Sequence, residues 1–305
     1  MRYIGVVICA LLLLAGCRSS SKSEPKSYRF AFVSPPSGLT DSARMAYMRD
    51  HYWDKFDFSD SLATVKADTT EMTRAFAIYV ADYVGPTNQE PIRHLMRKAS
   101  ASRSMFDYFV HLATTVLNDA NSPLRSDELY MAVLEAQVAT PLYNKYERMA
   151  PQYDLHIVSQ NRIGHIANDF RYTLASGKIG SFHAIKSDFT LLYINNPDCA
   201  MCRDITAQIV HSPILTEAER AGRLKIVALY PDRDLEAWRN HLSEYPKSWI
   251  NCYDDGCVIE RQRLYDLKAI PSLYLMDSQK RVLVKDSTNV GELEYVLNLK
   301  SGAKQ

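Results

Sequence analysis

The chain lacks a charge excess of either sign, because 36 Lys and Arg residues are balanced by 35 Asp and Glu residues among 305. Non-specific binding to nucleic acid needs a broad positive surface, so that class of function is excluded. Heptad runs and fixed-period repeats are also missing, which excludes coiled coils and solenoids. P-loop, GxGxxG and GxSxG motifs are absent as well. The composition is 47% hydrophobic and 23% charged, which with this length predicts about two globular domains.

Long apolar runs are scarce too. The run from Ile4 to Leu14 has 11 residues, too few to span a bilayer, and it follows Arg2. Residues 1–16 are therefore predicted to be a signal peptide. The motif Leu14-Ala15-Gly16-Cys17 resembles the bacterial lipoprotein signal, which implies cleavage before Cys17 and lipid on that residue. The alternative is an ordinary secretory signal with a chance cysteine at this place.

If the resemblance holds, lipid on Cys17 attaches the protein to a membrane in the cell envelope. Residues 17–38 are predicted to be a polar tether, since the segment after Cys17 is rich in Ser and Lys. This segment lacks the acidic cluster that resembles a surface-export signal of Bacteroidetes lipoproteins. We therefore expect an outer-membrane location facing the periplasm, where disulfides are permitted.

Cysteines are few and unevenly placed. Of the six, Cys9 leaves with the signal peptide and Cys17 is the predicted lipid site. Two close pairs remain, both in the C-terminal half: Cys199 and Cys202, and Cys252 and Cys257. An even number of cysteines in an exported protein indicates thiol–disulfide chemistry or a metal site.

Residues 39–164 are predicted to form an all-helical domain of five or six packed helices. One apolar stripe at helical spacing comprises Met72, Ala75, Phe76, Tyr79, Val80 and Tyr83. The run His51-Tyr52-Trp53-Asp54, followed by Asp57 and Asp60, is the one polar-aromatic cluster here. It lacks a second aligned histidine, so we interpret it as the end of an amphipathic helix and not as a metal site.

The pattern changes near residue 165. A predicted hairpin covers 170–182, and the apolar run 189–194 has the character of a buried central strand. A helix that begins at Cys199 follows, and then further strands and helices alternate to the C-terminus. The whole chain is thus predicted to be α+β, with an α/β domain at residues 165–305.

A buried strand, a Cys199-x-x-Cys202 motif at a helix start and Ile270-Pro271 before a late hairpin resemble the TlpA-like branch of the thioredoxin superfamily. The helical half is similar to DUF5106, a domain found before such domains in Bacteroidetes lipoproteins. The resemblance implies thiol–disulfide exchange on protein substrates, with a further redox partner, through Cys199, Cys202 and Pro271. A cis bond before Pro271 would offer a substrate strand a backbone edge beside Cys199. No cofactor and no metal are implied.

The motif also has a physical basis. A cysteine at a helix N-terminus meets unpaired backbone N–H groups and the positive end of the helix dipole, which favour its thiolate. Cys202 lies one turn further on the same face. Cys199 is therefore the predicted nucleophile, and Cys202 is predicted to resolve the mixed disulfide.

Three departures from the usual thioredoxin pattern leave the direction of the reaction open. Asp198 replaces the usual Trp before the first cysteine and should disfavour the Cys199 thiolate. Ala200-Met201 replaces Gly-Pro, and Tyr193 stands where thioredoxins bury an acidic residue. The base that accepts protons is therefore not identified.

Cys252 and Cys257 have two readings. We expect a structural disulfide around the turn Asp254-Asp255-Gly256, with a second redox pair as the alternative. For the whole chain, two other functions compete with oxidoreductase activity. The first is a docking module that has kept the fold, and the second is a zinc site made by all four cysteines. The 49 residues between the pairs exceed the usual zinc-ribbon spacing of about 15–20 residues.

Overall fold

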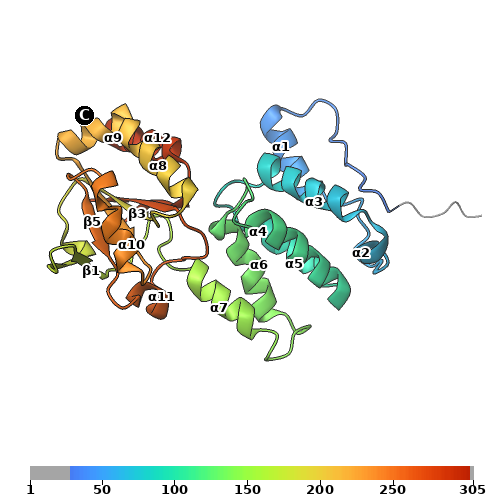
Figure 1. Ribbon diagram of the computed structural model, residues 1–305. Coiled ribbons are helices and arrows are strands. Elements are labelled where there is room, and N and C mark those ends of the chain that lie inside the picture. The colour runs from blue at the N-terminus through green and yellow to red at the C-terminus, as the bar shows by residue number, and fades with distance from the viewer. Residues whose placement is uncertain (1–27, 303–305) are drawn as a thin grey trace, which may run out of the picture.

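The computed structural model describes residues 28–302, which form a helical domain followed by an α/β domain (Figure 1). The predicted fold class is therefore confirmed. The predicted signal peptide, Cys9 and Cys17 lie outside the described residues. Among the described residues, the structure has no helix with the length and apolar character that a membrane crossing requires.

The helical domain contains seven α-helices within residues 28–161, where five or six were predicted. The four-residue helix α2 is too short to show a periodic pattern in the sequence. Their bounds are α1 (Asp41–His51), α2 (Ala63–Lys66), α3 (Thr69–Ile78), α4 (Glu90–Ala99), α5 (Arg103–Leu117), α6 (Asp127–Ala139) and α7 (Met149–Val158).

Local sequence explains where these helices begin and end. Asp68 caps α3, because its carboxylate accepts a hydrogen bond of 3.0 Å from the backbone N–H of Glu71. Ser102 and Ser126 cap α5 and α6 in the same way. The predicted stripe from Met72 to Tyr83 is divided, because α3 passes into a π-helical turn at Tyr79–Tyr83.

Aromatic side chains fill the core of the helical domain. Tyr52 and Trp53 are buried, and the Trp53 ring lies 5.3 Å from that of Phe109. On the outer side of the same helix end, the imidazole of His51 pairs with Asp54 at 2.7 Å. The His51–Asp54 cluster is thus an amphipathic helix end, as expected.

A seven-stranded sheet in the order β2-β1-β5-β4-β3-β6-β7 forms the second domain. The strands are β1 (Arg171–Leu174), β2 (Ile179–Ser181), β3 (Phe189–Ile194), β4 (Leu224–Tyr230), β5 (Ile250–Tyr253), β6 (Ser272–Asp277) and β7 (Val282–Ser287). β3 pairs parallel to β4 and antiparallel to β6, so it lies inside the sheet. All six of its residues are buried, as the apolar run predicted.

Helices cover both faces of this sheet. The helices are α8 (Ala200–His211), α9 (Pro213–Arg220), α10 (Leu235–Asn240), α11 (Val258–Gln262) and α12 (Val290–Gly302). Side chains of β3 alternate between two cores: Leu191 and Tyr193 pack with α8, α9 and α12, whereas Leu192 and Ile194 pack on the other side with Ile259 of α11. In Figure 1, α8, α9 and α12 lie together on one side of the sheet.

Buried charges join the two domains. Arg125, just before α6, forms an ion pair with Asp286 of β7, and Lys285 Nζ lies 2.9 Å from Asp127 Oδ2. The side chains of Lys285 and Asp127 are only 6% and 7% exposed. Because a buried charge without its partner is costly, these pairs fix one orientation of the domains.

A third carboxylate, that of Asp266, lies 3.8 Å from Arg125 and 3.1 Å from Lys268. The carboxylates of Asp127, Asp266 and Asp286 lie close enough together to hold a cation. Arg125, Lys268 and Lys285 already supply that positive charge from within the chain. We call these six side chains the interdomain charge cluster.

We expect Asp286→Asn to become more stable relative to the parent as the pH rises. Burial raises the pKa of the Asp286 carboxyl from 3.8 to about 6, so the folded state binds more protons than the unfolded state between these values. The parent therefore loses stability as the pH rises through this window, by at most a few kcal/mol.

Melting temperatures measured from about pH 4 to about pH 8 test this expectation. The melting temperature of the variant minus that of the parent should increase up to a pH of about 6 and then level off. Asp204→Asn, at an exposed position of α8 outside the interdomain charge cluster, is the control for removal of a carboxylate. A flat difference for Asp286→Asn would contradict the prediction.

Candidate functional site

The turn between β3 and α8 presents the first cysteine of the Cys-x-x-Cys motif. Asn196 organises this turn, because its carbonyl accepts from the Cys199 N–H at 3.1 Å and its side chain accepts from the Asp198 N–H at 3.0 Å. Helix α8 starts at Ala200, so Cys199 is its N-cap residue. The predicted placement of Cys199 at a helix start is confirmed.

The two thiols of the motif have different surroundings. Cys199 is partly exposed, and its Sγ donates to the carbonyl oxygen of Ile270 at 3.7 Å. The Ile270-Pro271 bond is cis. The hydrogen bond to Ile270 places Cys199 beside this bond, as expected. Cys202 is 1% exposed, and its Sγ accepts from the Asn196 N–H at 3.4 Å. Only Cys199 is open to a substrate.

Burial raises the pKa of the Cys202 thiol to about 12, although the Asn196 N–H opposes the shift. The neighbouring Cys199 raises the pKa further. In the reduced protein, Cys202 is therefore protonated at neutral pH.

Two buried phenols lie beneath the motif. The hydroxyl of Tyr193 donates to the carbonyl oxygen of Cys202 at 2.6 Å and also contacts the Thr206 hydroxyl. Burial raises the pKa of Tyr193 far above its usual value, so this group does not accept a proton as a carboxylate would. The Tyr245 hydroxyl donates to Asn195 Oδ1 at 2.7 Å and fixes the end of β3.

Asp198 has a neighbour that the sequence did not reveal. Its carboxylate is 68% exposed and lies 3.6 Å from Nε2 of His241, whose Nδ1 lies 2.7 Å from Glu244. A protonated His241 would offset the expected repulsion between Asp198 and a thiolate at Cys199. No spacing rule connects these residues, because His241 follows α10, some 40 positions after the motif.

The predicted Cys252–Cys257 disulfide is not formed in the structure, where both residues are buried free thiols. Their surroundings differ. Cys252 points into the sheet core, with its Sγ 3.6 Å from the carbonyl oxygen of Ala228. Cys257 has a left-handed backbone (φ 51°) and lies near the guanidinium of Arg233. The sequence separation suits a loop disulfide, but it does not reveal which way each side chain points.

The four cysteines do not converge on one point either. Within residues 28–302, the only group of three or more potential ligands close enough to hold a metal is that of Asp127, Asp266 and Asp286. The structure therefore gives no support to the alternative zinc site.

Comparison with known proteins agrees with the two-domain architecture. Residues 16–161 match a model described as a domain of unknown function, DUF5106, and residues 187–282 match a model described as thioredoxin-like. Nucleoredoxin from Danio rerio is 26% identical over 102 residues, which are 33% of this chain and 24% of that protein. The chain thus spans about a quarter of the length of that curated relative.

Two solved structures are more similar. The C-terminal domain of an uncharacterized protein from Bacteroides fragilis is 40% identical and covers 45% of this chain and 98% of its own, with a TM-score of 0.44. A thioredoxin-like protein from Bacteroides caccae is 36% identical, with a TM-score of 0.84 over 88% of this chain and 98% of that one. The similarity to the Bacteroides caccae protein extends over both domains. The chain therefore belongs to the thioredoxin-like family and carries a DUF5106 domain in front of its thioredoxin-like domain.

Proposed function

We propose that the protein is a thiol–disulfide oxidoreductase that acts on polypeptide substrates through Cys199 and Cys202. The observation that carries this proposal is the asymmetry of the pair. Cys199 is partly exposed at the start of α8, and Cys202 is buried one turn behind it. Exchange needs one accessible sulfur that attacks and a second that waits until a mixed disulfide has formed.

The reaction has two steps. In the first, the Cys199 thiolate attacks a substrate disulfide, the substrate S–S bond breaks, and one substrate sulfur leaves as a thiolate that takes up a proton. In the second, Cys202 loses its proton and attacks the Cys199 sulfur, which releases the other substrate sulfur as a thiol. The substrate gains two electrons and two protons, and the Cys199–Cys202 disulfide forms. Each step is reversible, so the redox partner sets the direction.

Backbone groups assist both sulfurs. The α8 N-terminus stabilises negative charge at Cys199, and the Asn196 N–H hydrogen bond favours the Cys202 thiolate. Tyr193 holds the Cys202 backbone carbonyl and leaves its sulfur free to move toward Cys199.

We also propose that the protein works in the cell envelope, attached by lipid on Cys17 to the outer membrane and facing the periplasm. The motif Leu14-Ala15-Gly16-Cys17 and the polar segment after it support this proposal. Such a compartment would supply substrates with disulfides.

We expect Cys202→Ala to accumulate mixed disulfides with polypeptide substrates, because the resolving thiol is gone while Cys199 still attacks. Cys199→Ala should trap few. Non-reducing gels and mass spectrometry of both variants provide the measurement. Cys257→Ala serves as a control with an intact motif and should trap no more than the parent. Absence of mixed disulfides from both motif variants would instead favour the docking module.

Alkylation of the reduced parent should label Cys199 well before Cys202. The pKa of Cys202 is raised to about 12, so its labelling rate should still be climbing at alkaline pH. Timed quenching followed by peptide mass spectrometry gives both rates. The denatured protein is the control and should label both equally. Equal rates in the folded protein would count against the proposed roles.

Cys17→Ala should move the protein from the membrane fraction to the soluble fraction, because the acyl chains that anchor it would be lost. Fractionation of cells expressing the parent and the variant measures this. A variant that sediments with membranes to the same extent as the parent would show that lipid on Cys17 is not the anchor.

A further inference from the structure

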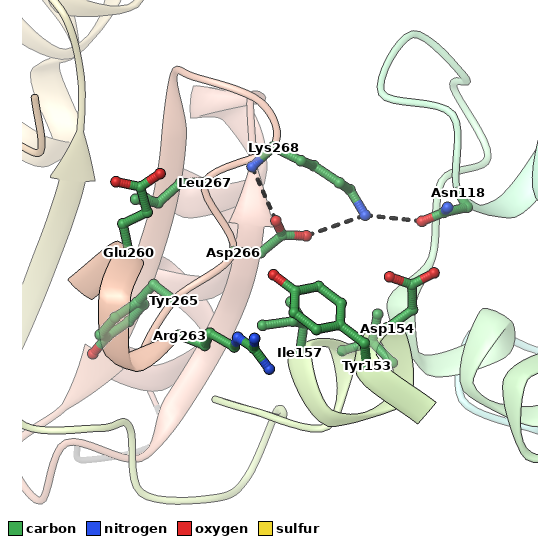
Figure 2. A pocket seen from close by; sticks show the side chains of 11 residues that line it. Asn118, Tyr153, Asp154, Ile157, Glu260, Arg263, Tyr265, Asp266, Leu267 and Lys268 are labelled. Carbon is green, nitrogen blue, oxygen red and sulfur yellow. Dashed lines mark hydrogen bonds and ion pairs between the residues drawn. The ribbon is translucent and has the colours of Figure 1, made fainter. Parts of the chain in front are cut away.

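A cavity of about 310 Å³ opens between the DUF5106 domain and the thioredoxin-like domain. Helix α7 lines it with Tyr153, Asp154 and Ile157, and the segment after α11 lines it with Arg263 and Lys268. Figure 2 shows these side chains facing one another across the domain boundary.

The cavity lies close to the reactive sulfur along the chain. Lys268 lines the cavity, and Ile270, two residues later, accepts the hydrogen bond from Cys199 Sγ. Two extended residues span at most about 7 Å. A polypeptide bound along this segment with its cysteine at Cys199 would therefore reach the cavity within a few residues.

An exposed apolar stripe leads into the cavity. Met149 and Tyr153 of α7 are 63% and 46% exposed and lie four residues apart, and Tyr146, in the turn before the helix, is 69% exposed. Ile157 continues the spacing and lines the cavity itself. Residues at these intervals share one face of a helix, so this part of the DUF5106 domain offers a continuous apolar surface.

The charged groups of the cavity are unequally paired. Lys268 is bound to Asp266 and to Asn118, at 3.1 and 2.8 Å (Figure 2). The Arg263 guanidinium lies over the Tyr153 ring, 4.0 Å from its centre. Within residues 28–302, by contrast, no hydrogen bond or ion pair reaches the Asp154 carboxylate.

Asp154 is thus a half-buried carboxylate without a direct counter-charge. Burial raises its pKa most, the charge of Lys268 lowers it, and Asp266 raises it. A basic side chain placed here would give Asp154 the ion-pair partner that no described residue of the protein supplies.

We propose that this cavity, with the adjoining face of α7, is a docking site for the substrate polypeptide. It takes a basic side chain at Asp154 and an apolar side chain at Tyr153 and Ile157, about three residues from the reacting cysteine. The inference rests on the proposed thiol–disulfide exchange, and it gives the DUF5106 domain a part in substrate choice.

The test uses the full chain in reduced form with three disulfide probes. Two probes are disulfide-linked dimers of a fluorescent peptide that contains one cysteine. One peptide carries Lys and the other Glu, about three residues from that cysteine. The third is dithiodipyridine, a small uncharged disulfide that cannot reach the cavity while it reacts at Cys199. Reduction rates are measured for the parent, Asp154→Lys, Tyr153→Ser and the control Tyr295→Ser, which changes an exposed tyrosine of α12.

The parent should reduce the Lys peptide about threefold faster than the Glu peptide, as a partly exposed ion pair allows. Asp154→Lys should reverse that preference. Tyr153→Ser should slow both peptides by about tenfold, the loss typical of a central aromatic contact. Dithiodipyridine rates should be unchanged in every variant, and Tyr295→Ser should match the parent throughout.

The inference is overturned if the parent reduces all three probes and neither Asp154→Lys nor Tyr153→Ser alters the peptide rates. The proposed function would stand in that case. If the parent reduces no probe at all, the proposed function itself fails. Circular dichroism checks folding, and should Tyr153→Ser unfold, the charge reversal at Asp154 decides alone.

Discussion

The arrangement of the two domains depends on the ion pair between Arg125 and Asp286. Arg125 belongs to the DUF5106 domain, and Asp286 lies on β7 of the thioredoxin-like domain. Asp286 also accepts a hydrogen bond of 2.6 Å from Ser272, the residue after Pro271. Arg125 of the helical domain is thus linked through Asp286 to Ser272, which follows the loop beside Cys199. Because Lys285 and Asp127 are buried next to this pair, a change in domain orientation would leave charges unpaired in a poorly solvated space.

Within the thioredoxin-like domain, burial does most to separate the roles of the two cysteines. Both belong to one helical turn, and the backbone N–H groups at the start of α8 favour negative charge at each. Desolvation opposes this at Cys202, which lies above Tyr193 and the sheet core. A phenol in place of a buried acid has a further consequence. It anchors the Cys202 backbone without providing a proton acceptor on the core side of the motif.

The parts of the fold that depend on local patterns could be predicted from the sequence. The buried strand 189–194, the helix that begins after Cys199 and the cap at Asp68 all follow from residues close together in the chain, whereas the cis bond before Pro271 was expected from the resemblance to thioredoxins. Interactions between distant segments were not predicted. Arg125 and Asp286 are 161 residues apart, and each alone resembles an ordinary surface charge. The orientations of Cys252 and Cys257 likewise depend on packing against β4 and Arg233, for which no short motif exists.

The segment from Arg263 to Ser272 connects these features into one arrangement. Its first residues line the cavity against α7, its middle offers the Ile270 carbonyl to Cys199, and its last residue binds Asp286. A binding surface on one domain can select substrates for a sulfur on another only if the distance between them is held closely, since small displacements of reacting groups are costly. The interdomain charge cluster holds the end of this segment, where Ser272 donates a hydrogen bond to Asp286. A DUF5106 domain attached in this way lines a cavity next to the candidate site, even though the described contacts of Cys199 all lie within the thioredoxin-like domain.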